Sequence, residues 1–496
     1  MNCAACHTRQ IQVDKTSYRI DGGPAISDFQ GFMSGIDDAV AHLLADPAAF
    51  KTFAADVLGG NPTDPEIQKL RTDVQAWFTP YDLLVKKALP ADNPWGPARL
   101  DAVGMIFNRL TGIDIGAAPD YSIPGNIMKA EAPVRYPFLW NAPIQDYTQW
   151  PGFAPNGDTA LGLVRNTGEV FGVFALFHPR KPVGKAPLNI DYVSVNSSNT
   201  LGLLSLEYLI GRQGAPQYQW PVDAALAKRG GEIFNWPTAQ GGCGECHGQR
   251  KGQFRSLLHE TWATTPLQDV GTDNREWVML GVPGDPAWPG WQVDTGVLNG
   301  AKIPLLAPAG LKATDSAFST LGVAVGGTIL ERAIEFGGGA RLKAKLADVA
   351  QNPDLATNGL PALSGAEKTE VETAFARPRQ QAALLTTGPY NGPFKYEARV
   401  LYGVWAAAPY LHNGSVPTLA DLLKPASDRP KSFQVGPSYD PVNVGLAPVQ
   451  PAFNYTLHTT GCDQRTSGES NCGHEFGTTT LTPDQKKALL EYLKTL

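Results

Sequence analysis

The feature that most constrains this chain is a short pattern, C-x-x-C-H, that occurs twice. The residues of its two copies are Cys3, Cys6 and His7, and then Cys243, Cys246 and His247. In this pattern two thiols can form thioethers to one edge of a porphyrin, and the following histidine then binds the iron. A zinc site needs a second nearby pair of ligands, which neither copy has. A redox C-x-x-C or chance explains one copy, but not two copies that hold four of the six cysteines. We therefore predict two covalently bound c-type haems, with His7 and His247 as proximal iron ligands.

The position of the first copy conflicts with this chemistry. Haem is attached outside the cytoplasm, yet only two residues precede Cys3. The second copy follows "VDAALAKRGGEIFNW", which has the apolar period of a helix, and the first copy has no such segment before it. We interpret the chain as N-terminally truncated, without its leader and first helix, and expect a periplasmic or secreted protein.

The two remaining cysteines lie close together near the C-terminus. Cys462 and Cys472 flank the polar segment of "GCDQRTSGESNCGH". We predict a disulfide between them, which indicates an oxidising compartment, and two free thiols are the alternative.

Composition predicts a loop-rich fold of two domains. A chain of 496 residues exceeds one small core, and its 52 glycines and 41 prolines favour short elements joined by long connections. We expect a mainly α, loop-rich fold with two cytochrome c-type haem domains, 1–215 and 216–496, long irregular insertions and few short strands. A net charge of −6 without a basic block argues against nucleic acid as a partner. No membrane span is expected, because Arg165 and Glu169 interrupt the most apolar stretch.

Periodicity and capping signals predict the helices. One lies within "SNTLGLLSLEYLIGRQGAP", and the segment 115–200 otherwise reads as irregular structure with short strands. In the last predicted helix, Thr482 is a plausible N-cap before Pro483. Including this last helix, the predicted helices with numbered bounds are 34–45, 47–58, 65–77, 97–110, 222–236, 327–348, 364–377, 417–424 and 482–495.

The second axial ligand of each iron decides what each haem can do. Two strong ligands make an electron carrier, and an open face permits chemistry on a small molecule. We favour His474, because it follows Cys472 in a loop that a disulfide would stiffen and precedes the final helix. His412 is a second candidate or a structural residue, and His42 reads as an ordinary helix residue. The remaining candidates are His178, His259, His458, Met33, Met105, Met128 and Met279.

The order of these motifs resembles the bacterial di-haem rubber oxygenases. The shared blocks are "RIDGGPA", "YPFLWNAPIQDYTQW", "RNTGEVFG", "GVWAAAPYLHNGSVPTLADLL" and "NCGHEFGTTTLTPDQKKALLEYLKTL", placed around the two C-x-x-C-H motifs. The related di-haem fatty-acid dioxygenases look similar, and all belong to the wider cytochrome c peroxidase superfamily. The "PYLHNGSVPTL" block is common to that superfamily and does not separate its branches.

This resemblance implies a role for each motif. His7 would hold the N-terminal, catalytic haem, whose distal face receives dioxygen, with Phe171 covering that face and Val170 beside it. His247 and His474 would be the axial ligands of a second, electron-storing haem. Trp140 or Trp150 would lie between the haems and help electrons cross. Core packing is the alternative explanation for Phe171 and for both tryptophans.

Three functions fit these residues. The first is a dioxygenase that adds dioxygen to C=C bonds of an apolar alkene, either a polyisoprenoid or an unsaturated fatty acid. An apolar distal face suits that reaction, whereas a peroxidase needs a polar group that moves protons. The second function is a di-haem peroxidase that receives electrons from a small redox donor. The third is a non-catalytic electron carrier with two six-coordinate irons.

Overall fold

The structure is a computed structural model, and it is helix-rich with few short strands, in agreement with the predicted fold class. It describes residues 3–157, 159–182, 188–249, 251–255, 260–262, 267–282, 284–303, 306–335, 392–462 and 465–496. The predicted helix 364–377, the end of the predicted helix 327–348 and His259 lie outside these residues. The predicted division into two haem domains stays a prediction.

The described helices range from one turn to seven. They are α1 (Phe29–Ala45), α2 (Pro47–Leu58), α3 (Asp64–Ala88), α4 (Ala102–Ile113), α5 (Thr159–Gly172), α6 (Thr200–Gly211), α7 (Ala224–Phe234), α8 (Gly244–His247), α9 (Arg275–Leu280), α10 (Ala317–Glu335), α13 (Leu419–Leu422) and α14 (Pro483–Leu493).

The described strands are short and pair two by two, all antiparallel. The pairs are β1 (Thr8–Val13) with β2 (Thr16–Asp21), β3 (Arg99–Leu100) with β4 (Val134–Arg135), β5 (Tyr147–Thr148) with β6 (Ala154–Pro155), β7 (Lys251–Arg255) with β8 (Glu260–Trp262), β9 (Leu267–Gln268) with β12 (Tyr396–Glu397), β10 (Gln292–Asp294) with β11 (Thr314–Ser316), β13 (Ser432–Gln434) with β16 (Thr456–His458), and β14 (Tyr439–Asp440) with β15 (Gly445–Leu446).

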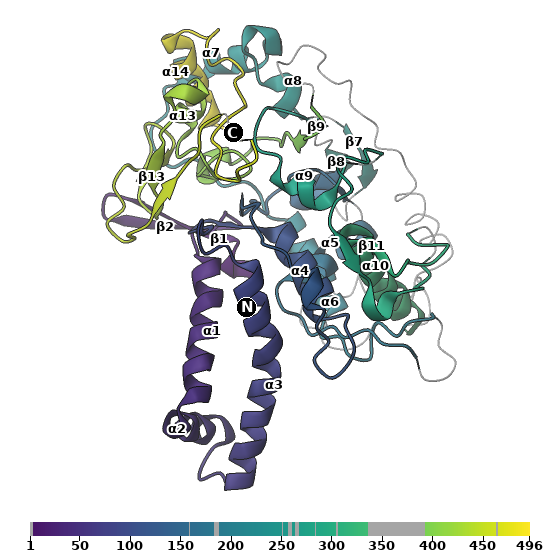
Figure 1. Ribbon diagram of the computed structural model, residues 1–496. Helices are drawn as coiled ribbons and strands as arrows, with labels where there is room; N and C mark the ends of the chain where they lie inside the picture. The colour runs from purple at the N-terminus through teal and green to yellow at the C-terminus, as the bar shows by residue number, and fades with distance from the viewer. Residues whose placement is uncertain are drawn as a thin grey trace.

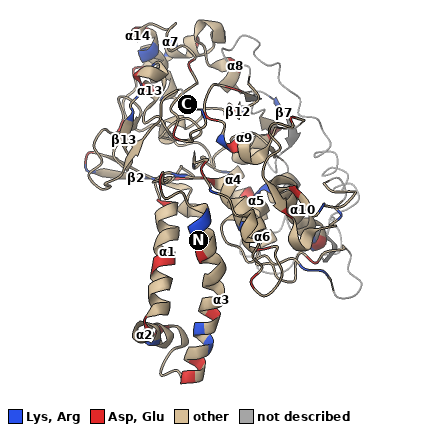
Figure 2. Cartoon of the chain, viewed as in Figure 1, with Lys and Arg blue, Asp and Glu red and all other residues tan. Residues whose placement is uncertain are grey.

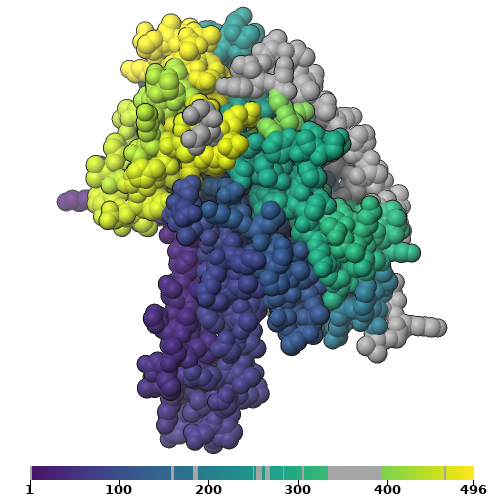
Figure 3. All heavy atoms as spheres, viewed as in Figure 1, coloured from purple at the N-terminus to yellow at the C-terminus, as the bar shows by residue number. Residues whose placement is uncertain are grey.

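Helices α1, α2 and α3 form an arm that projects from the rest of the molecule (Figures 1 and 3). Asp28 caps α1 by accepting from the Gly31 N–H, and Asp46 both ends α1 and caps α2. Apolar residues of α1 and α3, among them Met33 and Leu84, pack between the two helices. The outer surface of α3 carries charges of both signs (Figure 2), as expected of a helix side exposed to water.

Several helix boundaries differ from their predicted positions. Helix α1 begins five residues before the predicted 34, at the Asp28 cap. Helix α3 continues past the predicted end at 77 and through Pro80, because residues as far as Ala88 are buried against α1 and α4. Tertiary burial there outweighs the hydrogen bond that proline cannot donate. Helix α10 begins ten residues before the predicted 327.

The segment 115–200 was predicted to be irregular, and this is wrong for α5. This helix spans Thr159–Gly172 and packs against α4, α6 and α10. Three glycines at Gly162, Gly168 and Gly172 hide its helical period. They also permit close packing, since a side chain at Gly172 would collide with Ile106 of α4.

The C-terminal helix α14 packs against α7, which is the helix that precedes the second C-x-x-C-H motif in the sequence. The two helices meet at Gly230, where a Cβ atom would lie 2.0 Å from the Ala488 carbonyl oxygen. Thr482 caps α14 as predicted, in a reciprocal capping box with Gln485. The predicted disulfide between Cys462 and Cys472 is also present.

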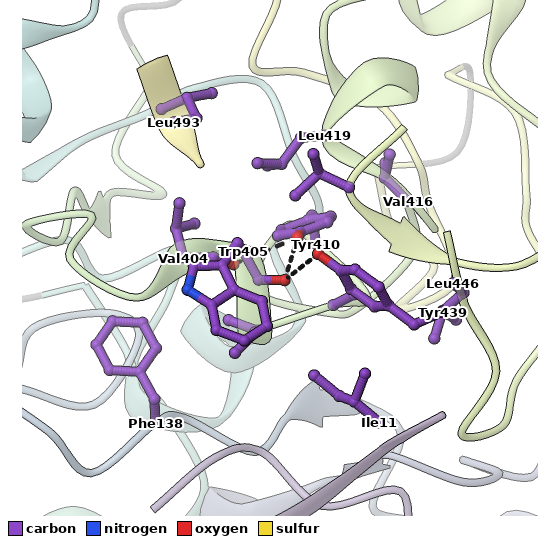
Figure 4. Close-up of a cluster of buried hydrophobic side chains, with 14 of the residues drawn as sticks. Ile11, Phe138, Val404, Trp405, Tyr410, Val416, Leu419, Tyr439, Leu446 and Leu493 are labelled. Carbon is purple, nitrogen blue, oxygen red and sulfur yellow. Dashed lines mark hydrogen bonds between the residues drawn. The ribbon is translucent and has the colours of Figure 1, made fainter. Parts of the chain in front are cut away.

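The largest buried cluster joins the two ends of the chain. Ile11 of β1 packs with Trp405, Tyr410 and Tyr439 from the C-terminal half (Figure 4). The Gln12 N–H also donates to the Pro437 carbonyl at 2.8 Å. The strand that follows the first motif is therefore held by residues more than 390 positions later in the sequence. Among the described residues, none of the helices combines the length and apolarity needed to span a bilayer.

Candidate functional site

Both C-x-x-C-H motifs fold into the same single turn. The His7 N–H donates to the Cys3 carbonyl at 3.0 Å, and the His247 N–H donates to the Cys243 carbonyl at 2.9 Å. In each motif the second cysteine N–H also bonds back to the first cysteine. The turn brings both cysteines and the histidine to one side, as attachment to a single porphyrin requires.

A backbone carbonyl orients each motif histidine. His7 Nδ1 lies 2.9 Å from the Pro137 oxygen, and His247 Nδ1 lies 2.7 Å from the Arg399 oxygen. A carbonyl can only accept, so Nδ1 carries the hydrogen in both rings. Nε2 is then the unprotonated nitrogen, which is the arrangement of a metal-binding imidazole with a fixed tautomer.

Burial shifts the pKa values of these groups away from those of a redox dithiol. Burial lowers the pKa of His7 to about 4 and lowers the pKa of His247, so both rings are neutral and able to bind metal at neutral pH. Burial raises the pKa of Cys6 to about 11 and that of Cys243 to about 12. A dithiol redox motif has the opposite shift, toward the thiolate.

His474 lies across from His247. The ring centroids are 6.0 Å apart, and the ring planes are inclined by 48°. Two imidazoles that bind one metal from opposite sides have centroids about 6 Å apart, because each metal–nitrogen bond is about 2 Å and each ring adds about 1 Å. Burial, and then the neighbouring His247, lower the pKa of His474 to about 3. These residues therefore fit an iron held between two histidines.

The loop that carries His474 is fixed from several sides. Arg429 donates to the carbonyls of Asn471 at 2.6 Å and Gly473 at 2.8 Å, and the His474 N–H donates to the Val270 carbonyl at 2.7 Å. Gly473 has a φ of 75°, and a Cβ atom there would lie 2.3 Å from the Val270 oxygen. The neighbouring disulfide restrains the same loop, so His474 is presented by a rigid segment.

The other candidate ligands have different surroundings. His412 is buried, with Nε2 at 2.8 Å from Asp273 and its ring stacked on Tyr396 at 3.9 Å. His178 stacks on Tyr121 at 3.8 Å. The remaining candidates are placed in α1 (His42), on β16 (His458), in apolar clusters (Met33, Met105, Met279) and at an exposed position (Met128). In the part of the chain that the structure describes, the ring contacts pair His247 with His474 but give His7 no histidine partner.

Helix α5 brings two charged side chains near the first motif. Burial is the main cause that lowers the pKa of His7, and Arg165 lowers it further. Burial is also the main cause that raises the pKa of the Cys3 thiol, and Glu169 raises it further. Gln149 donates to Glu169 at 3.2 Å. Buried Glu207 pairs with Arg165 and holds it in place. We did not predict these residues as functional, although an Arg and a Glu four positions apart in an apolar stretch mark one polar helix face.

Phe171 and Val170 lie on other faces of α5. Phe171 is about 200° around the helix from Glu169, since each residue turns about 100°. It is fully buried and stacks on Phe177 at 4.3 Å within an apolar cluster. Val170 packs against the cluster that contains Leu163 and Leu204. The role of both residues at the first haem stays a prediction.

Trp150 connects the surroundings of the two motif histidines. The guanidinium groups of Arg135 and Arg399 lie 4.6 and 4.4 Å from its ring centroid. Arg399 supplies the carbonyl for His247, and Arg135 lies two residues before Pro137, which supplies the carbonyl for His7. Trp140 instead stacks on Phe138 at 4.8 Å and donates to the Tyr402 carbonyl.

Residues 395–434 match the family described as RoxA-like, cytochrome c-like. This segment is similar to a cytochrome c. It contains Arg399, which orients His247, and the "PYLHNGSVPTL" block. The match indicates a c-type haem with iron and a haem-dependent oxidoreductase, and it supports the resemblance to the rubber oxygenases.

Two relatives from Sinorhizobium fredii are also similar to this chain. The uncharacterized protein y4iJ is 28% identical over 529 residues, which cover 100% of this chain and 76% of that protein. The uncharacterized protein y4iM is 41% identical over 121 residues, which cover 20% of this chain and 27% of that protein.

Proposed function

We propose that this chain is a di-haem c-type oxidoreductase in which the haem at His7 is the reaction site. The haem between His247 and His474 would store electrons. The observation that carries this proposal is the unequal surroundings of the two motif histidines. His247 has a second imidazole 6.0 Å away, whereas His7 has no histidine ring partner among the described residues.

The leading reaction is the addition of dioxygen to C=C bonds of a polyisoprenoid or an unsaturated fatty acid. The RoxA-like match and the order of the sequence motifs support it. Both oxygen atoms end in the product, so the reaction consumes no external reductant. The haem would supply dioxygen binding, and this chain's residues would orient the haem and limit access of water. The Cys462–Cys472 disulfide supports a periplasmic or secreted location.

Trp150 is the residue that we propose for electron exchange between the haems. Its ring contacts arginines from both segments that orient the motif histidines, which gives a short route of packed atoms. The two nearby cations disfavour an oxidised, positively charged indole. Trp150 would therefore pass electrons without accumulating as a radical cation.

A specific observation favours peroxide reduction as a second candidate function. Glu169, hydrogen-bonded to Gln149, lies near the Cys3 thiol, on the α5 face that also carries Arg165. A carboxyl group there could deliver protons to a leaving oxygen, which is the group that a peroxidase needs and an alkene oxygenase does not.

Gas binding and product analysis test the proposal. We expect carbon monoxide to bind about one haem per chain, because the proposal leaves an open face at the haem held by His7 and none at the haem between His247 and His474. We also expect consumption of latex, squalene or oleate under dioxygen without added reductant. Two low-spin haems that ignore carbon monoxide would instead identify an electron carrier. Peroxide turnover with reduced cytochrome c, without alkene consumption, would identify a peroxidase.

Substitution of Glu169 separates the two reactions. We expect Glu169→Gln to leave alkene consumption unchanged, because adding dioxygen across a double bond requires no net proton transfer. In a peroxidase the same change should slow peroxide reduction about 100-fold or more. Glu131→Gln is the matched control, since Glu131 and Glu169 side chains are both 46% exposed and both lie near an arginine. A large loss of alkene turnover in Glu169→Gln alone would contradict the leading reaction.

A further inference from the structure

Three buried arginines lie beside the two segments that orient the motif histidines. Arg9, Arg135 and Arg399 are 1%, 7% and 6% exposed. Only Arg399 pairs with a carboxylate, that of Glu397. In the described part of the chain, neither Arg9 nor Arg135 forms an ion pair. Buried cations normally need an anionic partner, so this cluster contains about two unbalanced positive charges.

The hydrogen bonds of Arg9 and Arg135 are incomplete as well. Arg9 donates to the Ala408 carbonyl at 2.7 Å and to the Pro24 carbonyl at 3.4 Å, and Arg135 donates to the Leu411 carbonyl at 3.0 Å. Arg9 Nε and Arg135 Nη1 are buried without a hydrogen-bond partner. Arginine keeps its proton in proteins, so both guanidinium groups are positively charged, and neither has an anionic partner among the described residues.

Both arginines are close in sequence to the groups that fix the first proximal histidine. Arg9 lies in β1, two residues after His7, and it donates to the Pro24 carbonyl; the N–H of the next residue, Ala25, donates to the Cys6 carbonyl at 3.0 Å. Arg135 ends β4, two residues before Pro137, whose carbonyl accepts from His7. The unpaired cations therefore belong to the surroundings of the first motif.

We propose that Arg9 and Arg135 bind carboxylate, and that this carboxylate is a propionate of the haem at His7. The inference rests on the proposed function, which assigns a haem to that motif. Guanidinium groups pair with carboxylates through parallel N–H bonds, which would use the unpartnered Arg9 Nε and Arg135 Nη1. The second source of the same chemistry is the carboxylate of a fatty-acid substrate, and the experiment below distinguishes the two.

This pairing would raise the reduction potential of one haem selectively. Positive charge beside a propionate disfavours the ferric state, because ferric iron carries one more positive charge than ferrous iron. Removing one guanidinium should therefore favour oxidation of the haem at His7 and leave the haem at His247 unchanged.

Spectroelectrochemical titration of the haem-loaded protein tests this inference. We expect Arg135→Gln and Arg9→Gln each to shift the reduction equilibrium of the carbon monoxide-binding haem about tenfold toward ferric, about 59 mV for one electron. Arg135→Lys keeps the charge and should remain closer to the parent, and it also serves if the glutamine variants bind less haem. Arg109→Gln is the matched control, because Arg109 is equally buried at 7% but already pairs with Asp114.

The outcomes separate the possible occupants. A shift confined to one haem, together with an altered propionate band in its resonance Raman spectrum, supports the proposal. Unchanged potentials in both glutamine variants overturn it, and weaker oleate binding in those variants would then assign the arginines to a substrate carboxylate. Failure of the proposed function appears separately, as no consumption of latex, squalene or oleate under dioxygen, and leaves the potential shift measurable.

Discussion

Replacing His474 with alanine is expected to convert the second haem from six-coordinate and low-spin to five-coordinate. Carbon monoxide binding should then rise from about one to about two haems per chain, since an iron that loses a strong axial ligand opens a face to gases. The total haem content should not change, because Cys243, Cys246 and His247 remain in place. Optical titration with carbon monoxide and a pyridine haemochrome assay on the same sample measure both quantities.

The expected effect is large because, in the described part of the chain, no histidine ring other than His474 is in contact with His247. Among the described residues, His412 is committed to Asp273 and Tyr396, and the loop around His474 is held by Arg429 and the disulfide. A loop fixed in this way cannot easily bring another donor to the iron. The second haem of the variant should also lose the electron-storing role that we propose for it.

His458→Ala is the control for this experiment. His458 is an exposed histidine on β16 in the same half of the chain, so its loss should leave the spectra of both haems unchanged. If His474→Ala keeps two spectra like those of the parent, with no additional carbon monoxide binding, His474 is not the ligand. The assignment of an electron-storing haem at His247 would then be wrong.

Local chemistry accounts for what could be predicted from the sequence. The disulfide and the Thr482 cap depend on residues a few positions apart, and the structure contains both. His474 was expected to be an axial ligand because a disulfide-restrained loop precedes the last helix, and the family resemblance paired it with His247. The ring centroids of the two histidines are 6.0 Å apart. Their role as iron ligands stays a prediction.

Long-range packing accounts for what could not be predicted. The sequence of α5 mixes glycines with apolar and charged residues, and its packing against α4, α6 and α10 stabilises the helix. The orientation of that helix brings Glu169 near the Cys3 thiol. Likewise, the pairing of Arg135 and Arg399 around Trp150 joins segments more than 240 residues apart, which no local pattern reveals.

The second large expected effect concerns stability. Arg99 of β3 and Glu469 form a bidentate ion pair, with nitrogen–oxygen distances of 2.6 and 3.2 Å. Their side chains are 1% and 2% exposed, and Arg99 also donates to the Trp95 and Asn413 carbonyls. We expect Arg99→Met to destabilise the haem-loaded protein by about 3–5 kcal/mol, because it leaves the Glu469 carboxylate buried without its cation. The shift of the urea unfolding midpoint measures this loss.

The pH dependence and a double substitution identify the cause of that loss. Burial already raises the pKa of Glu469, and Arg99 opposes this shift. Without Arg99 the folded-state pKa of Glu469 should rise further. The destabilisation should therefore be full above this raised pKa and shrink as the pH falls through it and the carboxyl group becomes protonated. Arg99→Met combined with Glu469→Leu should recover most of the stability, since two apolar side chains leave no buried charge.

Lys69→Met, which breaks the exposed pair with Asp73, is the control and should cost less than about 0.5 kcal/mol. A pH-independent loss, or a double variant no more stable than Arg99→Met, would show that lost packing and not an unpaired carboxylate is responsible.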